Sequence, residues 1–292
     1  MLNTSAAIFT CLAAGIQIGA NAANFWRKIL TERDNNLNID GERQPLVSVI
    51  MPAYNAEKYI AEAIQSVISQ TYTNWELFVL DDCSTDGTAE IAEGFARADG
   101  RIHLLKNPQN MGVARTRNRG FDLAQGEWIA LLDSDDVWHS DKLEKQLEVA
   151  NESGAEIIYS SYALFTDGES GKTQYNVPVR TNYSNMLKEN VIGCSTVLLS
   201  KALLENFRFR VDVYHEDYAL WLELLRNGHA AAGCVEVLTN YRIVKGSRSN
   251  SKLRAAKNRW IIYRKAEKLP LLKAISFFAA YAVNGFNKHK RI

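Results

Sequence analysis

The sequence predicts an α/β fold in which a mostly parallel sheet is flanked by helices. Short apolar runs alternate along the chain with longer segments whose apolar residues recur every three or four positions. The apolar runs end abruptly in polar, acid-rich turns, as buried parallel strands do. With 292 residues and 47% hydrophobic content, the chain can bury a full core. Such alternation indicates parallel strands joined by right-handed crossovers.

Residues 1–45 are expected to form an extension and a linker that precede the main domain. Residues 6–20 are apolar but too short to span a bilayer, and no Lys or Arg precedes them as in a signal peptide. A helix lying on a surface and an extension without function are both consistent with this pattern. From Thr31 to Pro45 the chain is polar and rich in turn-forming residues, which is typical of a linker.

The predicted elements then follow in order. Strands are predicted at residues 46–51, 75–80, 102–105 and 127–132, and helices at residues 57–70, 88–98, 112–124 and 140–151. A later helix is predicted at residues 216–226, with Trp221, Leu222, Leu224 and Leu225 on its apolar face. Residues 160–215 are expected to supply loops that shape a substrate pocket.

Three polar groups follow predicted strands: Pro52-Ala53-Tyr54-Asn55, Asp81-Asp82 and Asp133-Ser134-Asp135-Asp136. Because parallel strands point their carboxyl ends the same way, these groups should meet at one rim of the sheet. Three acids within four residues repel one another unless a cation neutralises them, and hard divalent ions prefer oxygen ligands. The rim therefore predicts a metal site that also holds a nucleoside diphosphate. A solvated turn and a helix-capping loop are the alternatives for the two acidic groups.

Together these motifs resemble the family 2 glycosyltransferases, which have a GT-A fold with a Rossmann-like sheet. The resemblance covers residues 46–241, with the motifs in family order. It also includes Asn110-Met111-Gly112, Arg117-Asn118-Arg119-Gly120, Gly126-Glu127 and His215-Glu216-Asp217-Tyr218. The region looks most like bacterial transferases that build teichuronic acid, O-antigen or capsule.

The resemblance implies a UDP-sugar donor. The implied donor-binding residues are Pro52, Ala53, Tyr54, Asn55, Asp81, Asp82, Arg117, Asp133, Ser134, Arg242 and Arg248. Ala53 and Tyr54 would line the uracil pocket, and Asp82 would read the base. Asp133 would touch the ribose or the donor sugar. Arg117 would approach the base or the diphosphate, with a surface arginine as the alternative.

The resemblance also implies that Asp135 holds Mg²⁺ or Mn²⁺ across the diphosphate. One departure from the family pattern is Cys83, which stands where the family usually has Gly. A left-handed backbone conformation would strain a Cys at this position, so a different turn is expected there.

By the same resemblance, Asp217 is the general base that deprotonates the acceptor hydroxyl, and Glu216 supports it. A sugar hydroxyl attacks an anomeric carbon poorly until its proton is being removed. The alternative is that both acids only favour a helix amino terminus. Trp221 could stack on an acceptor sugar or belong to the core. A single base with no nucleophile beside it implies one displacement and inversion, giving a β-linkage.

The carboxyl-terminal residues carry a strong positive charge. Residues 242–292 contain 14 Lys and Arg residues and one acid, Glu267, so the tail is near +13 and residues 1–241 are near −12. Arg242 and Arg248 would lie in a loop that closes over the donor, or in an ordinary surface loop. Residues 253–268 interleave cations with aromatic residues, and residues 271–286 are apolar. This pattern predicts a basic amphipathic helical tail on an anionic membrane surface, in preference to nucleic acid.

These observations predict a cytoplasmic, peripherally membrane-bound, metal-dependent inverting glycosyltransferase. Its substrates would be a UDP-sugar and a glycan linked to polyprenyl diphosphate. Scattered Cys residues without paired spacing favour the cytoplasm. A sugar nucleotidyltransferase is one alternative, although the Gly-rich loop expected after its first strand is missing here. A catalytically inactive transferase that acts as a membrane scaffold is the other. The sequence makes no prediction about oligomeric state.

Overall fold

One mixed sheet organises the part of the chain that the computed structural model describes, which is residues 44–166, 169–244 and 252–289. Within these residues the strand order is β3-β2-β1-β4-β9-β6-β10-β5, with β7 on β6 and β8 on β10. The first four strands are parallel: β1 (Val47–Ala53), β2 (Trp75–Asp81), β3 (Ile102–Lys106) and β4 (Trp128–Leu131). The sequence predicted all four of these strands.

The other half of the sheet is mixed. The strands β9 (Leu198–Ser200) and β6 (Ile157–Thr166) continue from β4 in antiparallel pairs, and β10 (Ala231–Arg242) runs parallel to β6. Three strands add antiparallel edges: β5 (Val137–Trp138), β7 (Glu169–Tyr175) and β8 (Arg180–Thr181). Residues 160–215, which were expected to supply loops that shape a pocket, also contain β7, β8 and β9.

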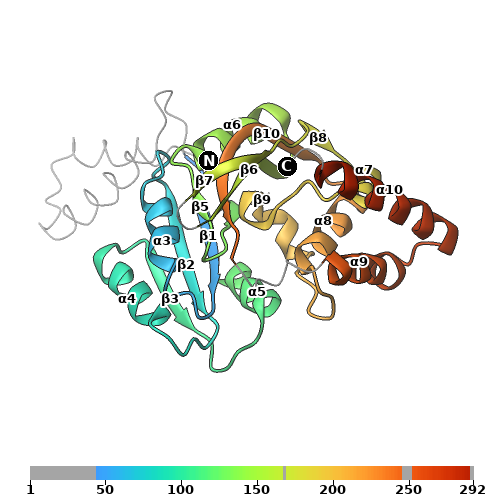
Figure 1. Ribbon diagram of the computed structural model, residues 1–292. Coiled ribbons are helices and arrows are strands. Elements are labelled where there is room, and N and C mark those ends of the chain that lie inside the picture. Colours follow the sequence, from blue (N-terminus) through green and yellow to red (C-terminus); the bar gives the residue numbers. More distant parts are fainter. Residues whose placement is uncertain (1–43, 167–168, 245–251, 290–292) are drawn as a thin grey trace, which may run out of the picture. The chain divides into compact units, whose positions relative to one another are not determined.

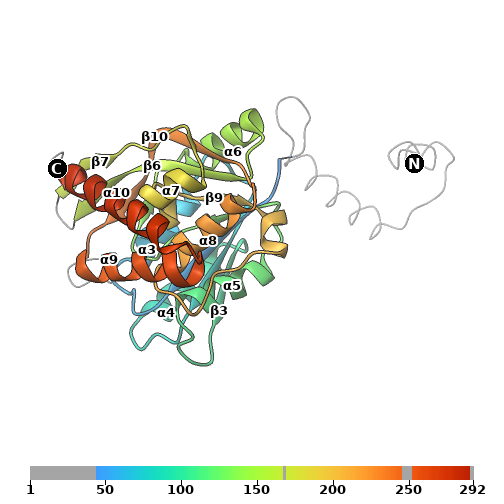
Figure 2. The ribbon, with the colours of Figure 1, turned by 90° about the vertical axis from the view of Figure 1, so that its right-hand side faces the viewer.

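Helices cover both faces of the sheet (Figures 1 and 2). One face carries α3 (Ile60–Ile68), α4 (Thr88–Ala98) and α6 (Lys142–Ser153). The other carries α5 (Val113–Leu123), α7 (Tyr183–Lys188) and α8 (Glu216–Arg226). Along β1 the side chains alternate between the two cores: Val47, Val49 and Met51 pack on the first face, and Ile50 packs on the second. Two 3₁₀ turns, η1 (Cys194–Thr196) and η2 (Lys201–Glu205), flank β9.

The carboxyl-terminal segment packs into the second core. It comprises α9 (Lys252–Ile261), a π-helical segment η3 (Ile262–Ala266) and α10 (Leu271–His289). Ile262, Tyr263 and Ala274 are fully buried there. Glu267, the single acid of this segment, accepts hydrogen bonds from Tyr183 at 2.7 Å and Arg226 at 3.0 Å. The segment is therefore helical and basic as predicted, but its first part is a piece of the folded core.

Contacts divide the chain at residue 44, so that residues 45–292 form one unit. The predicted boundary at residues 241–242 falls inside β10, which ends at Arg242. The predictions for residues 1–43 lie outside the described residues. Within the described residues, no helix has both the length and the hydropathy needed to cross a membrane.

Candidate active site

A cavity of about 270 Å³ lies at the carboxyl ends of β1 and β2. Its lining combines the end of β1 and the residue after it with Asp82 and the start of α5. The lining residues are Pro52, Ala53, Tyr54, Asp82, Asn110, Gly112 and Val113. The Tyr54 side chain is 50% exposed, so its ring is accessible to a ligand. The structure thus brings together the predicted groups after the first and second strands.

The Asp82 carboxylate forms one wall of this cavity and also holds the loop that precedes α5. Its oxygens accept hydrogen bonds from the backbone N–H groups of Met111 and Gly112, both at 2.8 Å, and from the Asn107 amide at 2.7 Å. Gly112 has a φ of +81°, which favours glycine. Sequence reasoning assigned no role to Asn110, Gly112 or Val113. The Asn110-Met111-Gly112 motif is the one sequence signal that could have indicated these lining residues.

The turn after β2 is built by short polar contacts. The Asp81 carboxylate accepts a hydrogen bond from the Ser84 N–H at 3.2 Å. Asp81 and Asp82 are 3% and 4% exposed, so the alternative of a solvated turn is wrong. The Asn55 amide oxygen accepts a hydrogen bond from the Thr85 N–H at 2.9 Å, which joins the loops after β1 and β2. Cys83 has a φ of +66°. The expectation of a different turn is therefore wrong, because Cys83 adopts the left-handed conformation despite its side chain.

The acidic turn after β4 places its carboxylates in unlike surroundings. Asp136 is buried, and its carboxylate accepts hydrogen bonds from the Ser195 hydroxyl at 2.5 Å and the Arg242 backbone N–H at 2.9 Å. Ser134 and Asp135 are partly exposed at the tip. Burial and the charge of Asp133 raise the pKa of Asp135 to about 6. Asp136 therefore anchors the turn, and Asp133 and Asp135 are its partly exposed carboxylates.

Arg242 lies against this turn at the end of β10. Its Nε donates a hydrogen bond to the Asp135 carbonyl at 2.8 Å, and its guanidinium forms an ion pair with Glu62. The rings of Tyr59 and Phe165 both contact the guanidinium, at 4.4 and 4.2 Å from their centroids. Arg242 is buried in a strand, which corrects the expectation of a loop. Arg248 lies outside the described residues.

Arg117 joins the acidic turn after β4 to the amino terminus of α8. Its guanidinium donates to the Asp133 carboxylate at 2.6 Å and to the Glu216 carboxylate at 2.8 Å. The Phe209 ring lies 5.2 Å from it. Arg117 is 4% exposed, so the surface-arginine alternative is wrong. Its two ion pairs make it a connector within the site.

Asp217 directly follows Glu216 in α8 and is partly exposed. Burial and the neighbouring charge of Glu216 raise its pKa to about 6, and the charge of Arg117 opposes this rise. A carboxylate with such a pKa is still ionised at neutral pH but accepts a proton more readily than a solvated one. Asp217 is therefore a partly exposed carboxylate with a raised pKa, and Glu216 is engaged in holding Arg117.

Trp221 does not fit its expected role. It is fully buried, and it packs edge-on against Phe209 with ring centroids 6.2 Å apart. A side chain without exposed surface cannot stack on an acceptor sugar, so the expectation is wrong and the core alternative holds. Within the described residues, no cluster of three or more His, Cys, Asp or Glu side chains could hold a metal ion.

The structure thus has a cavity at the carboxyl ends of two parallel strands, where open α/β sheets bind ligands, an acidic turn after β4 and a partly exposed carboxylate at the start of α8. Residues 48–203 match the family described as Glycosyl transferase family 2. The chain belongs to this family and has its GT-A fold, as the motifs indicated.

Two relatives match over most of their length. The chain is 40% identical to the "Putative teichuronic acid biosynthesis glycosyltransferase TuaG" of Bacillus subtilis, over 84% of this chain and 98% of that protein. It is 39% identical to the "UDP-Glc:alpha-D-GlcNAc-diphosphoundecaprenol beta-1,3-glucosyltransferase WfgD" of Escherichia coli, over 84% of this chain and 95% of that one.

One solved structure illustrates the shared fold. It is the mannosyltransferase PcManGT from Pyrobaculum calidifontis, in complex with GDP-Man and Mn²⁺. The TM-score is 0.65 at 20% identity, and the match covers 90% of this chain and 81% of that one.

Proposed function

We propose that this chain is an inverting glycosyltransferase that moves a sugar from a UDP-sugar to a glycan carried on polyprenyl diphosphate. The reaction would serve the assembly of a bacterial cell-surface polysaccharide. The observation that carries the proposal is the double ion pair of Arg117, whose guanidinium binds both Asp133 of the acidic turn and Glu216, the neighbour of Asp217. The name of WfgD contains a UDP-sugar donor and a diphosphoundecaprenol-linked acceptor, and the name of TuaG contains teichuronic acid biosynthesis, which supports these substrate classes and this role.

In this mechanism the cavity at β1 and β2 binds the uridine, with Tyr54 against the base and Asp82 as the polar wall. The Asp217 carboxylate accepts the proton of the acceptor hydroxyl while that oxygen attacks the anomeric carbon. The bond to the diphosphate breaks on the opposite side, so an α-linked donor yields a β-linked product. Arg117 holds Glu216, which keeps the start of α8 and hence Asp217 in place.

A divalent ion, Mg²⁺ or Mn²⁺, fits the acidic turn. Asp135 is partly exposed, and its carboxylate accepts a hydrogen bond from its own backbone N–H, which leaves an oxygen for an ion. Asp133 and Asp136 add negative charge beside it, as the direction of the Asp135 pKa shift reflects. Asp135 would hold the ion, with diphosphate oxygens as the remaining ligands. The ion would supply Lewis-acid stabilisation of the departing diphosphate.

A panel of UDP-sugars, incubated with GlcNAc-diphosphoundecaprenol and Mn²⁺, tests this function. We expect release of UDP from one donor and a product whose new anomeric proton shows the β configuration by NMR. Asp135→Ala should abolish the Mn²⁺-dependent part of UDP binding measured by calorimetry, and Asp141→Ala on the nearby surface should not. An α-linked product would refute inversion, and unchanged UDP affinity in Asp135→Ala would refute the metal assignment.

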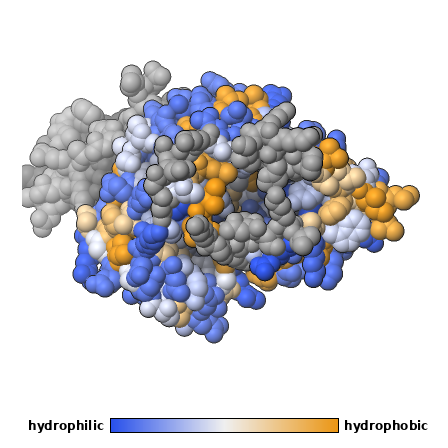
Figure 3. All heavy atoms as spheres, in the orientation of Figure 1, coloured by the Kyte–Doolittle hydropathy of each residue, from blue (hydrophilic) through white to orange (hydrophobic). Residues whose placement is uncertain are grey.

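Attachment to the cytoplasmic face of the inner membrane is the other part of the proposal. Leu271, Leu272, Ile275 and Val283 are exposed apolar residues of α10, and at 100° per residue they fall within one third of its circumference. Figure 3 shows hydrophobic side chains gathered at the end of the molecule where α10 begins. The surrounding tail is strongly basic. An apolar helix face within a basic segment favours an anionic lipid interface.

Point substitutions test this attachment better than truncation, because Ile262 and Tyr263 of the same segment are core residues. Leu272→Ser combined with Ile275→Ser should reduce sedimentation with phosphatidylglycerol vesicles and leave UDP binding unchanged. Val179→Ser is a matched control, since Val179 is 62% exposed and lies elsewhere. Equal sedimentation of the double variant and the control would refute the assignment of this surface.

A further inference from the structure

A second cavity, of about 100 Å³, shares no lining residue with the nucleotide cavity. It is lined by residues of β6, the end of β7 and the segment before η1. This volume is far below the roughly 300–1,000 Å³ of cavities that enclose drug-sized ligands. The cavity can therefore hold part of a single small ring.

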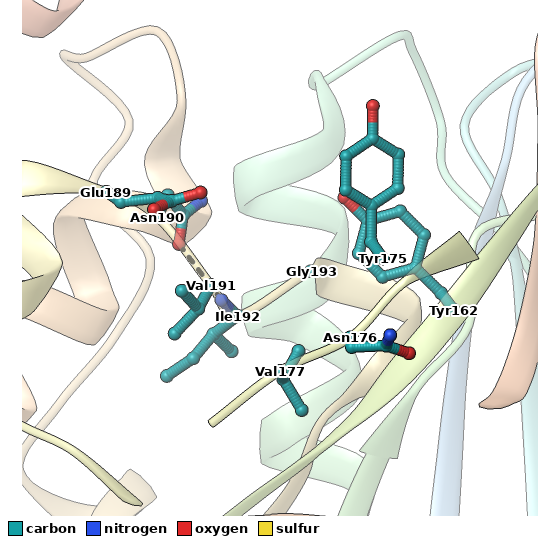
Figure 4. Close-up of a pocket in the computed structure, with 9 residues that line it drawn as sticks. All are labelled: Tyr162, Tyr175, Asn176, Val177, Glu189, Asn190, Val191, Ile192 and Gly193. Carbon is teal, nitrogen blue, oxygen red and sulfur yellow. Dashed lines mark hydrogen bonds between the residues drawn. The ribbon is translucent and has the colours of Figure 1, made fainter. Parts of the chain in front are cut away.

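The lining has three chemically different parts. The rings of Tyr162 and Tyr175 stack with centroids 4.9 Å apart. Figure 4 shows Glu189 and Asn190 across the cavity from these rings, with aliphatic side chains, Val177 among them, in the lower part of the view. A pyranose has an apolar C–H face that packs on aromatic rings and hydroxyls that bond to carboxylate and amide groups. The cavity therefore matches a sugar ring.

The charge of the lining selects among sugars. None of the nine described residues that line the cavity is Lys, Arg or His, and Glu189 is acidic. Anionic ligands such as phosphate or a uronate are recognised by cationic side chains, and they are repelled by a carboxylate. The lining therefore favours a neutral ring, including one that carries an amide, over an acidic one.

The strand order relates this second cavity to the nucleotide cavity and to the acidic turn. The nucleotide cavity belongs to β1 and β2, the acidic turn follows β4, and β6 comes two strands further along the sheet. Gly193 of the cavity wall lies two residues before Ser195, whose hydroxyl donates to Asp136. Burial together with the charges of Glu189 and Asp136 raises the pKa of the Tyr162 phenol, which places this phenol within electrostatic reach of the acidic turn. A ring bound here would lie near the acidic turn without sharing a lining residue with the nucleotide cavity, which favours an acceptor ring over the nucleotide.

We propose that this cavity binds a neutral pyranose ring of the acceptor glycan and so contributes to acceptor specificity. The inference rests on the proposed function for the identity of its ligand. Tyr175 supplies the stacking surface at the open edge, Glu189 accepts hydrogen bonds from ring hydroxyls, and Asn190 faces the same space. The nucleotide cavity does not depend on any of these three side chains.

Saturation-transfer NMR on the full chain with UDP present tests the proposal without any turnover. The probes are methyl N-acetyl-α-glucosaminide and methyl α-glucuronide. The first should give a signal and the second none. Tyr175→Ala should weaken binding of the first probe by about ten-fold, the size of one aromatic contact. Tyr175→Phe, which keeps the ring, and Thr173→Ala, on the same strand but outside the lining, should retain it.

In all three variants the calorimetric affinity for UDP should stay within about two-fold of wild type. Unchanged probe binding in Tyr175→Ala, equal binding of the glucuronide, or a parallel loss of UDP affinity would each overturn the assignment. UDP release from a UDP-sugar by the wild-type protein tests the proposed function separately. Turnover without probe binding would refute the acceptor cavity alone, and probe binding without turnover would refute the proposed function while supporting a sugar site.

Discussion

The two halves of the sheet build the site in different ways. In the parallel half, the acids of the site lie just after strand ends, as Asp82 follows β2 and Asp133 lies two residues beyond β4. In the mixed half, the groups come from a helix start, a 3₁₀ turn and a strand end: Asp217, Ser195 and Arg242. In the parallel half, the positions of these acids can thus be recognised from residues that are adjacent in the sequence. The mixed half contributes through contacts between residues far apart in the chain.

Three such contacts join the halves. Arg117 pairs with Glu216, 99 residues away. Ser195 donates to Asp136 across 59 residues, and Arg242 pairs with Glu62 across 180. Each contact has a charged partner from the parallel half and fixes a segment of the mixed half. Substituting these partners should therefore separate effects on donor binding from effects on transfer.

The largest effect is expected for Arg117, which joins the two halves directly. Arg117→Met leaves the Asp133 and Glu216 carboxylates facing each other without a cation, and we expect a loss of about 3–5 kcal/mol in the free energy of unfolding. Urea denaturation measures this loss. Arg115→Met, on the same helix but exposed, should change it by less than about 0.5 kcal/mol. A loss for Arg117→Met as small as that of the control would show that the halves do not depend on this bridge.

Asp217→Asn should separate the halves functionally. The amide keeps the shape but accepts no proton, so transfer at saturating donor should fall by about 10²-fold or more while UDP affinity stays unchanged. In the wild type, kcat/KM should fall as the pH decreases through about 6, because Asp217 becomes protonated there. A pH–rate profile of the wild type and single-turnover rates of the variant measure both effects. Transfer within a few-fold of wild type would place the base elsewhere.

The same contrast explains what the sequence could and could not predict. Strand-end acids such as Asp133 and Asp135 are recognisable because the apolar run and the polar turn are adjacent in sequence. The double pairing of Arg117 was not predictable, since nothing local distinguishes it from Arg115 or Arg119. Trp221 lies one helical turn beyond Asp217, but its side chain packs against Phe209 in the core. Helical spacing gives the separation of side chains along a helix, and packing decides which face is buried.

The buried Lys142 of α6 offers a test of how the mixed half of the sheet is stabilised. It is fully buried in α6, and its ammonium donates to Gln146, whose amide in turn donates to the Thr196 carbonyl of η1 at 2.8 Å. Burial lowers the pKa of Lys142 to about 7. Between pH 7 and 10.5 the unfolded chain therefore binds more protons at this residue than the folded chain, so its contribution to stability rises with pH in that window.

Lys142→Met removes this dependence. The variant should be more stable than wild type by about 2 kcal/mol at pH 6, because a buried charge is replaced by an apolar side chain of similar length. The difference should shrink toward pH 10. Urea midpoints at several pH values measure it, with Lys145→Met on the exposed face of the same helix as the control. A difference that is constant with pH would show that Lys142 stays charged when buried.

The smallest effect is expected at Cys83, where the parallel half departs from its family pattern. A left-handed conformation costs a residue with a Cβ about 1–2 kcal/mol, and glycine offsets part of that gain by its greater freedom when unfolded. Cys83→Gly should therefore stabilise the protein by about 0.5–1 kcal/mol. UDP affinity should not change, because the turn already has the conformation that glycine favours. Thermal unfolding of Cys83→Gly and Cys83→Ala distinguishes the causes: alanine removes the thiol but keeps the strain. Equal melting temperatures for the two variants would show that the backbone of this turn relaxes around its side chain.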